Sequence, residues 1–232
     1  MNYYEWEVNS LEDFNLQKEV SDRYSLRGRV FNKLREDILA GVYRENEELK
    51  ENTIGIELGV SRTPVREALR QLELEGLVTM IPNKGAYVTG ITSKDIHDIY
   101  MIRSYLEGLC ARWACENITD SQIEALEEAL YLSDFHAGRG HNGQLVELDN
   151  KFHELIYKAS GSKILNHMLS DFHHYVERVR KITLAVPDRA AKAREEHAAI
   201  LDAIRKRDGN LAEKLAHEHI INSMKNLTER GL

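Results

Sequence analysis

Cysteine is scarce in this sequence of 232 residues, and long hydrophobic runs are missing. Cys110 and Cys115 are the two cysteines, and they do not form a CxxC pair. We therefore expect both to be reduced residues in or beside a core. No stretch approaches the roughly 18 apolar residues of a membrane-spanning helix, and the acidic start does not resemble a secretion signal. These features favour a cytoplasmic protein without a membrane partner.

An excess of positive charge is also missing, because the formal net charge is −7 and the pI is near 5.8. A general DNA-packaging protein would be basic, so the sequence disfavours that class. Residues 1–25 hold six acids and two bases, whereas residues 26–90 hold ten of each. We interpret residues 1–25 as an acidic arm. A neutral segment such as 26–90 favours DNA binding in a defined orientation if its cations lie on one face.

The segment Gly59–Leu69 reads Gly-Val-Ser-Arg-Thr-Pro-Val-Arg-Glu-Ala-Leu and predicts a DNA-recognition helix with its entry turn. Gly59 can adopt the positive φ of a tight turn between helices. Ser61 and Thr63 are both candidates for the N-cap, and Pro64 suits the first helical turn.

Three arginines of this helix recur every four residues and so share one face: Arg62, Arg66 and Arg70. Guanidinium groups on such a face suit DNA phosphates and the acceptor edge of guanine. The alternative is a solvated surface helix with ordinary salt bridges.

The flanking patterns favour the DNA-binding interpretation. They predict helices over 26–40 and 52–58 before this helix, and strands over 77–81 and 86–89 after it. The turn at 82–85 joins the two strands into a hairpin, so residues 26–90 predict a winged helix-turn-helix domain. Lys84 and Gly85 at the tip provide a cation and a bare backbone that can approach a phosphate or the minor groove.

From Thr92 onward the pattern is entirely helical. The predicted helices cover 92–117, 120–135, 142–159, 163–182, 189–206 and 211–229, with Pro187 in a loop. Capping boxes are expected at Thr92 with Asp95, at Thr119 with Gln122 and, more weakly, at Asn210 with Glu213. Five apolar residues of the first helix are expected to face the core: Ile96, Ile99, Ile102, Leu106 and Leu109. The predicted fold class is mainly α, with the winged domain followed by an antiparallel bundle of six to seven helices over 91–232.

Four ionisable residues of this bundle lie among apolar neighbours. Asp149 and His153 are four apart and project from one helix face, while His197 and His219 stand on the last two helices. Three imidazoles and one carboxylate suit a divalent ion such as Zn²⁺, Ni²⁺, Mn²⁺ or Fe²⁺. Because the chain has ten histidines, solvated or hydrogen-bonded histidines are the alternative. The other histidines, including His173, show no such convergence.

The N-terminal residues resemble the GntR family of bacterial transcription regulators. The resemblance covers residues 26–90 and is carried by Gly59–Leu69, Leu74–Val78 and the wing Asn83–Gly85. It implies contacts with operator DNA by three residues of the recognition helix and by the wing: Arg62, Thr63, Arg66 and Gly85. Family members often carry a basic residue where this chain has Asn52, so operator preference does not transfer directly.

The helical part resembles the FCD effector domain of the FadR branch of this family. Four segments over about residues 93–226 carry the resemblance: Arg103–Glu107, Asp149–His153, Glu196–Ile204 and Ala216–His219. The resemblance implies that the aspartate and the three histidines hold a divalent ion, Zn²⁺ in the first place. Arg103 has two interpretations. Its spacing suits a salt bridge to Glu107 one turn along, whereas the resemblance favours a clamp on an effector carboxylate.

Together these observations predict a homodimeric transcription regulator that is not an enzyme. It would bind a pseudo-palindromic DNA operator and be controlled by a small carboxylate held near a divalent metal in the bundle. The alternative is a metal-dependent hydrolase that uses the same Asp/His cluster with Glu107 or Glu196 as general base. Four protein ligands exceed the usual three of catalytic zinc, and no nucleophile elbow or phosphate loop appears in the sequence.

Overall fold

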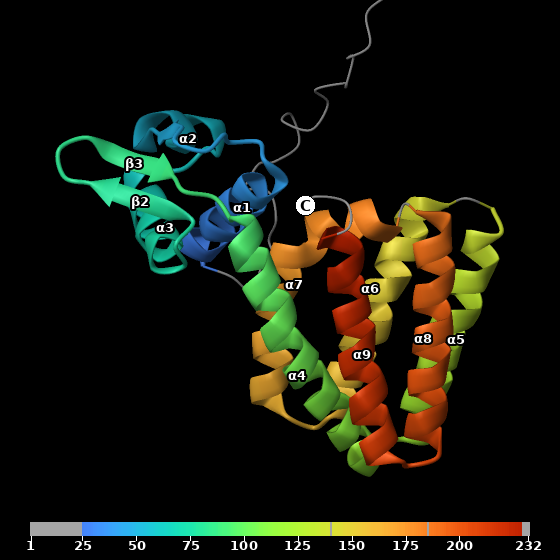
Figure 1. Cartoon of the computed structure of the whole chain (residues 1–232). Helices are drawn as coiled ribbons and strands as arrows, with labels where there is room; N and C mark the ends of the chain where they lie inside the picture. The colour runs from blue at the N-terminus through green and yellow to red at the C-terminus, as the bar shows by residue number, and fades with distance from the viewer. Residues whose placement is uncertain (1–24, 140, 185, 229–232) are drawn as a thin grey trace, which may run out of the picture. The chain divides into compact units, whose positions relative to one another are not determined.

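A computed structural model describes residues 25–139, 141–184 and 186–228 (Figure 1). The chain folds as two compact units, and the boundary between them falls between Ile91 and Thr92. Apart from Ser25, the predicted acidic arm lies outside the described residues. Across the described ranges, no helix is both long enough and apolar enough to cross a membrane.

The first unit contains the predicted winged helix-turn-helix. Its elements are α1 (Leu26–Ala40), β1 (Glu48–Leu49), α2 (Glu51–Glu57), α3 (Arg62–Leu74), β2 (Val78–Ile81) and β3 (Gly85–Val88). The strands form an antiparallel sheet in the order β1-β3-β2, with Glu48 opposite Tyr87 and Met80 opposite Ala86. The sequence did not predict β1, because two residues are too short to show an alternating pattern.

Glycines end the first helix and shape the turn into α3. Gly41 follows α1 with φ 78°, and Gly59 lies between α2 and α3 with φ 64°, a region that favours glycine. Ser61 occupies the N-cap of α3, although its side chain makes no capping hydrogen bond, and Thr63 lies inside the helix. The turn into α3, the predicted recognition helix, therefore forms without a side-chain cap from Ser61.

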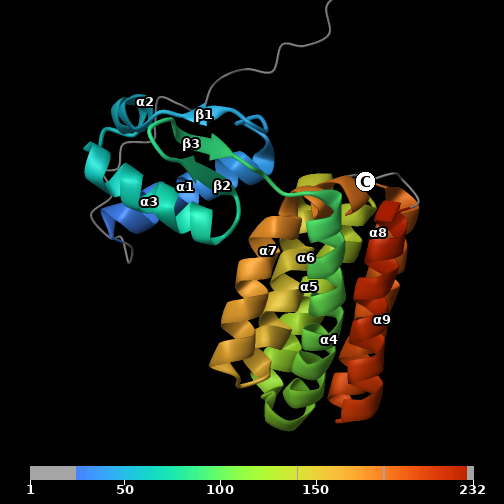
Figure 2. The ribbon, with the colours of Figure 1, turned by 60° about the vertical axis from the view of Figure 1, so that its left-hand side comes forward.

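A row of apolar residues attaches α3 to α1. Val65, Ala68, Leu69 and Leu72 are buried on α3, and their helical spacing gives that helix one apolar face. Burying a leucine or valine contributes about 1.5–3 kcal/mol, so this face fixes the helix in the unit. Figure 2 also shows the β2–β3 hairpin beside α3, where β2 contacts the helix. The opposite face of α3 carries exposed side chains.

The second unit is a bundle of six helices within the described residues (Figure 2). They are α4 (Ser93–Asn117), α5 (Asp120–Ala137), α6 (Asn142–Ala159), α7 (Lys163–Leu184), α8 (Pro187–Arg205) and α9 (Gly209–Thr228). Among the described helices, α4 and α9 share the most extensive contact. Gly108 permits it, because a Cβ there would lie 2.9 Å from the carbonyl oxygen of Glu213.

The structure confirms two of the three expected capping boxes. Both reciprocal hydrogen bonds form at Thr92 and at Thr119. The third, between Asn210 and Glu213, was wrong, because α9 begins at Gly209, two residues before the predicted start at Leu211. Asp208 accepts the hydrogen bond from the backbone N–H of Leu211 at 3.0 Å, and Asn210 accepts one from Arg112 instead.

Two further expectations for the bundle were wrong. Pro187 begins α8 and does not lie in a loop, because proline suits the first position of a helix, where no N–H is required. Ile102 is 47% exposed, whereas Arg103 and Glu107 are buried. These two charged residues occupy core positions of α4, and the apolar pattern therefore placed Ile102 wrongly, whereas the other four residues pack against the core.

Candidate functional site

The outer face of α3 presents the predicted arginines to solvent. Arg62, Arg66 and Arg70 have side chains that are 61%, 44% and 62% exposed. Thr63 is exposed at the start of the same helix. Arg62 and Arg66 pair with Glu51 on α2, a residue that the sequence analysis did not identify, and Arg70 pairs with Glu67.

The wing places Lys84 and Gly85 where β2 turns into β3. Both residues are exposed, and positive φ angles at Asn83 (62°) and Gly85 (110°) turn the chain. The hydroxyl of Tyr87 donates to the carbonyl of Lys84 at 3.3 Å. The first unit thus carries exposed cations on α3 and a further one at its hairpin tip.

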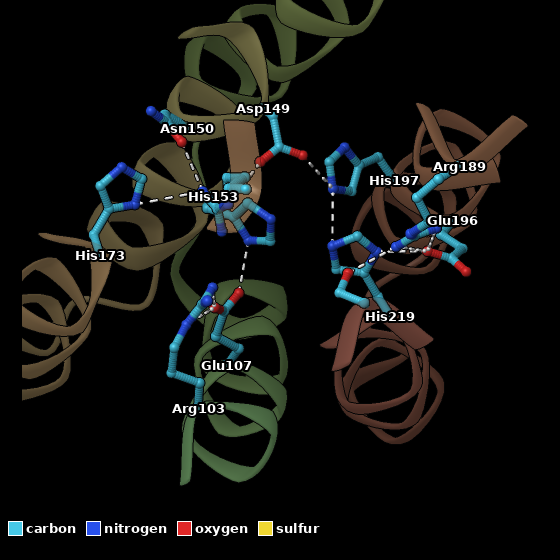
Figure 3. Close-up of polar contacts among 12 residues, drawn as sticks. Arg103, Glu107, Asp149, Asn150, His153, His173, Arg189, Glu196, His197 and His219 are labelled. Atoms are coloured by element: carbon cyan, nitrogen blue, oxygen red, sulfur yellow. Dashed lines mark hydrogen bonds and ion pairs between the residues drawn. The ribbon is translucent and has the colours of Figure 1, made fainter. Parts of the chain in front are cut away.

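In the second unit, the predicted aspartate and histidines converge between helices (Figure 3). Asp149 and His153 project from α6, His197 from α8 and His219 from α9, and all four are buried. One ligand nitrogen from each histidine lies within 4.8 Å of the other two. The structure therefore brings together residues that are up to 70 positions apart in the sequence.

The distances between these groups suit a divalent ion. Nε2 of His197 lies 3.2 Å from Nε2 of His219 and 3.7 Å from Oδ1 of Asp149. Two nitrogens bound tetrahedrally to zinc at about 2.0–2.1 Å would be about 3.3–3.4 Å apart. Nε2 of His153 is buried without a hydrogen-bond partner among the described residues. A buried unpaired nitrogen costs about 1–3 kcal/mol, and a metal ion would satisfy it.

Two glutamates orient the histidines from outside this cluster. Nδ1 of His153 lies 2.6 Å from Oε2 of Glu107, and Nδ1 of His219 lies 2.7 Å from Oε2 of Glu196. A hydrogen bond from Nδ1–H to a carboxylate leaves the lone pair of Nε2 directed inward, as in many metal-ligating histidines. The sequence analysis considered both glutamates only as bases or salt-bridge partners.

Three buried arginines surround the same cluster. The guanidinium of Arg103 pairs with Glu107, and its Nη1 has no hydrogen-bond partner among the described residues. Nε of Arg180 lies 3.1 Å from Oδ2 of Asp149, and Arg189 donates to Glu196 at 3.0 Å. The sequence analysis missed Arg180, because it stands in the basic run Arg178–Lys181, where spacing does not distinguish one cation from another.

The protonation states that follow from these contacts suit metal binding. Burial alone would raise the pKa of Asp149, but Arg180 and the histidines hold it below its ordinary value. Burial and the neighbouring His219 lower the pKa of His197 well below its usual value, and burial also lowers that of His219. At neutral pH the carboxylate is therefore ionised and these two histidines are neutral, as metal ligands must be.

Two hollows adjoin the cluster. One has more polar than apolar lining residues, and its polar side chains include Tyr100, Arg103, Asp149, Arg180, Arg189 and His219. The other is mainly apolar and includes Leu130, Leu145, Leu148, Phe152 and Leu184 beside Asp149 and His197. Nδ1 of His173, which the sequence left unassigned, lies 3.4 Å from Nη1 of Arg180.

Each of the two units matches the model of a known protein family. Residues 26–88 match the model of the bacterial regulatory proteins of the gntR family, and residues 98–222 match the FCD domain. The Nta operon transcriptional regulator of Aminobacter aminovorans is 32% identical over 75% of this chain and 82% of its own length. The HTH-type transcriptional repressor RspR of Escherichia coli (strain K12) is 29% identical over 83% of this chain and 84% of its own length.

Solved structures support the fold. The structure of E. coli McbR/YncC superimposes with a TM-score of 0.71 at 23% identity, and the match covers 90% of this chain and all of that one. At this level of identity the similarity concerns the fold alone.

The hydrogen bond from His219 to Glu196 gives a testable consequence for metal binding. Glu196→Gln would remove the carboxylate that orients His219, so we expect the affinity for Zn²⁺ to fall by about 10–100-fold. Competition with a chromogenic zinc chelator measures this change. Glu195→Gln, at an exposed position on the same helix, is the control and should bind zinc like the unmodified protein. Equal affinities in all three proteins would contradict the role of Glu196.

Proposed function

The chain belongs to the GntR family of bacterial regulatory proteins and carries an FCD domain, and on this basis we propose that it is a transcription regulator controlled by a small carboxylate. One observation above all supports the proposal. A buried, charge-balanced histidine cluster lies in the FCD domain of a chain whose other unit presents arginines on an exposed recognition helix.

For the first unit we propose DNA contacts by α3 and by the wing. We infer that Arg62, Thr63, Arg66 and Arg70 approach the major groove and that Lys84 and Gly85 contact the backbone or minor groove. One recognition helix supplies few base contacts, so a homodimer on a pseudo-palindromic operator doubles them. The name of the relative RspR supports repression as the outcome of DNA binding.

For the second unit we propose that a divalent ion is held by Asp149, His153, His197 and His219. Mixed imidazole and carboxylate ligands suit Zn²⁺ first, with Ni²⁺, Mn²⁺ or Fe²⁺ as alternatives. The bound ion would act as a Lewis acid toward an oxygen of the effector. The unpaired Nε2 of His153 and the two glutamate-oriented histidines are the structural support for this assignment.

The charges around the site favour an anionic effector. Arg103, Arg180 and Arg189 balance the three carboxylates of Asp149, Glu107 and Glu196, so a divalent ion would leave the centre with two excess positive charges. Arg103 lines the polar hollow, and its Nη1, which is buried and unpaired among the described residues, is a free donor for a carboxylate. We therefore propose a small carboxylate as effector and Arg103 as one of its ligands.

The geometry gives little support to a hydrolase. Glu107 and Glu196, the two candidate general bases, are each engaged by a histidine and an arginine. A base needs a free oxygen within hydrogen-bond reach of the attacking water. The relatives reported above are transcription regulators, which agrees with a role without catalysis.

The recognition-helix assignment predicts the behaviour of an arginine variant. Arg66→Ala should lower affinity for the operator by about tenfold to a hundredfold, because a bidentate contact with a base is lost. A duplex enriched from a random-sequence library by the unmodified protein serves as operator in an electrophoretic shift assay. Arg112→Ala, at an exposed position in the other unit, is the control. Unchanged operator affinity in Arg66→Ala would contradict the assignment.

The metal assignment predicts a joint loss of metal and stability. His197→Ala should reduce the divalent metal content of untagged protein and lower its melting temperature, since bound metal stabilises the folded state. Plasma emission analysis and thermal melts with and without chelator measure the two effects. His167→Ala removes an exposed histidine of α7 and should change neither. A chelator-insensitive melting temperature in the unmodified protein would contradict the assignment.

A further inference from the structure

One carboxylate holds two of the DNA-facing arginines. Glu51 stands in the first turn of α2, and its two oxygens accept hydrogen bonds from Arg66 at 2.8 Å (Nε to Oε1) and 2.7 Å (Nη2 to Oε2). Arg62 donates to Oε2 as well, from Nε at 3.3 Å and from Nη2 at 3.1 Å. Glu51 therefore fixes Arg66 with a fork and Arg62 with longer contacts to a single oxygen.

The geometry of the Arg66 fork leaves the end of its guanidinium available. A guanidinium has five N–H groups, and the side-on pair uses one on Nε and one on Nη2. The remaining three lie on Nη1 and Nη2, the pair of nitrogens that can form a bidentate contact with O6 and N7 of guanine. Glu51 thus engages Arg66 without occupying the edge that reads a base.

The side-chain exposures show that the Glu51 carboxylate lies behind the two guanidinium groups. The Glu51 side chain is 20% exposed, whereas those of Arg66 and Arg62 are 44% and 61% exposed. The carboxylate lies nearer the body of the unit, and the guanidinium groups lie nearer solvent. Hydrogen bonds from Arg66 lower the pKa of Glu51, in agreement with an ionised carboxylate at neutral pH.

We propose that Glu51 is a positioning residue that determines DNA specificity, an inference that rests on the proposed DNA-binding function. By holding the fork of Arg66 in one orientation, it reduces the conformational entropy lost when that side chain contacts a base. Its negative charge also partly offsets Arg62 and Arg66, which lowers their attraction to phosphates of any sequence. Both effects raise the ratio of specific to nonspecific affinity.

The test compares two DNA probes. One is the duplex that the unmodified protein enriches from a random-sequence library, and the other is a shuffled duplex of the same composition. We expect Glu51→Gln to bind the shuffled duplex severalfold more tightly and to lower the affinity ratio between the probes by about tenfold. Thermal melts of each variant serve to check that all the proteins compared are folded.

A matched control separates the effect of losing the Arg66 contact from the effect of losing a negative charge. Glu57→Gln removes one exposed carboxylate from the same short helix, and it should leave the affinity ratio within about twofold of the unmodified protein. A double-mutant cycle then tests whether Glu51 acts through Arg66. In an Arg66→Ala background, Glu51→Gln should lower the ratio much less than it does alone.

Three results would overturn the inference. They are an unchanged ratio in Glu51→Gln, an equal fall in Glu57→Gln, or a fall in the Arg66→Ala background as large as in the unmodified protein. Failure of the unmodified protein to enrich any duplex would instead contradict the proposed DNA-binding function itself, so the two failures are distinguishable.

Discussion

The burial of charge inside the helical bundle is the constraint on which the rest of its structure depends. Arg103, Glu107, Asp149 and Arg180 lie where a bundle usually holds apolar side chains, and each has an oppositely charged partner. Removing one partner of a buried ion pair costs about 3–5 kcal/mol, because the other is left uncompensated. The partners come from α4, α6 and α7, with further pairs on α8 and α9. The same contacts therefore hold these helices together and form the candidate metal site.

The DNA-binding unit uses charge in a different way. Its arginines are exposed and contribute little to stability, since surface ion pairs are worth about 0–1 kcal/mol. For the proposed base contacts their fixed orientation matters, and an apolar face under α3 and the carboxylate of Glu51 both contribute to that orientation. In the first unit α3 thus contributes Val65, Leu69 and Leu72 to the core and carries the proposed function on its opposite face.

The sequence predicted most elements, because caps, turns and periodic apolar residues are local signals. It placed α6 at its observed bounds and put His153, His197 and His219 in one group. It did not predict that Glu107 and Glu196 orient two of these histidines, or that Arg180 pairs with Asp149. Those contacts join different helices, and spacing along one helix carries no information about which partner faces it. Ile102 was misplaced for a related reason, since a buried ion pair occupies the core positions of α4.

The central claim is that anion binding at the charged centre of the bundle changes the affinity of the other unit for DNA. Calorimetry on zinc-loaded protein, with a panel of small carboxylates and with the enriched duplex present or absent, tests this claim most directly. The account predicts that one carboxylate binds, that it changes the affinity for the duplex, and that the duplex changes the affinity for the carboxylate by the same factor. An affinity for the carboxylate that is the same with and without saturating duplex would contradict the account.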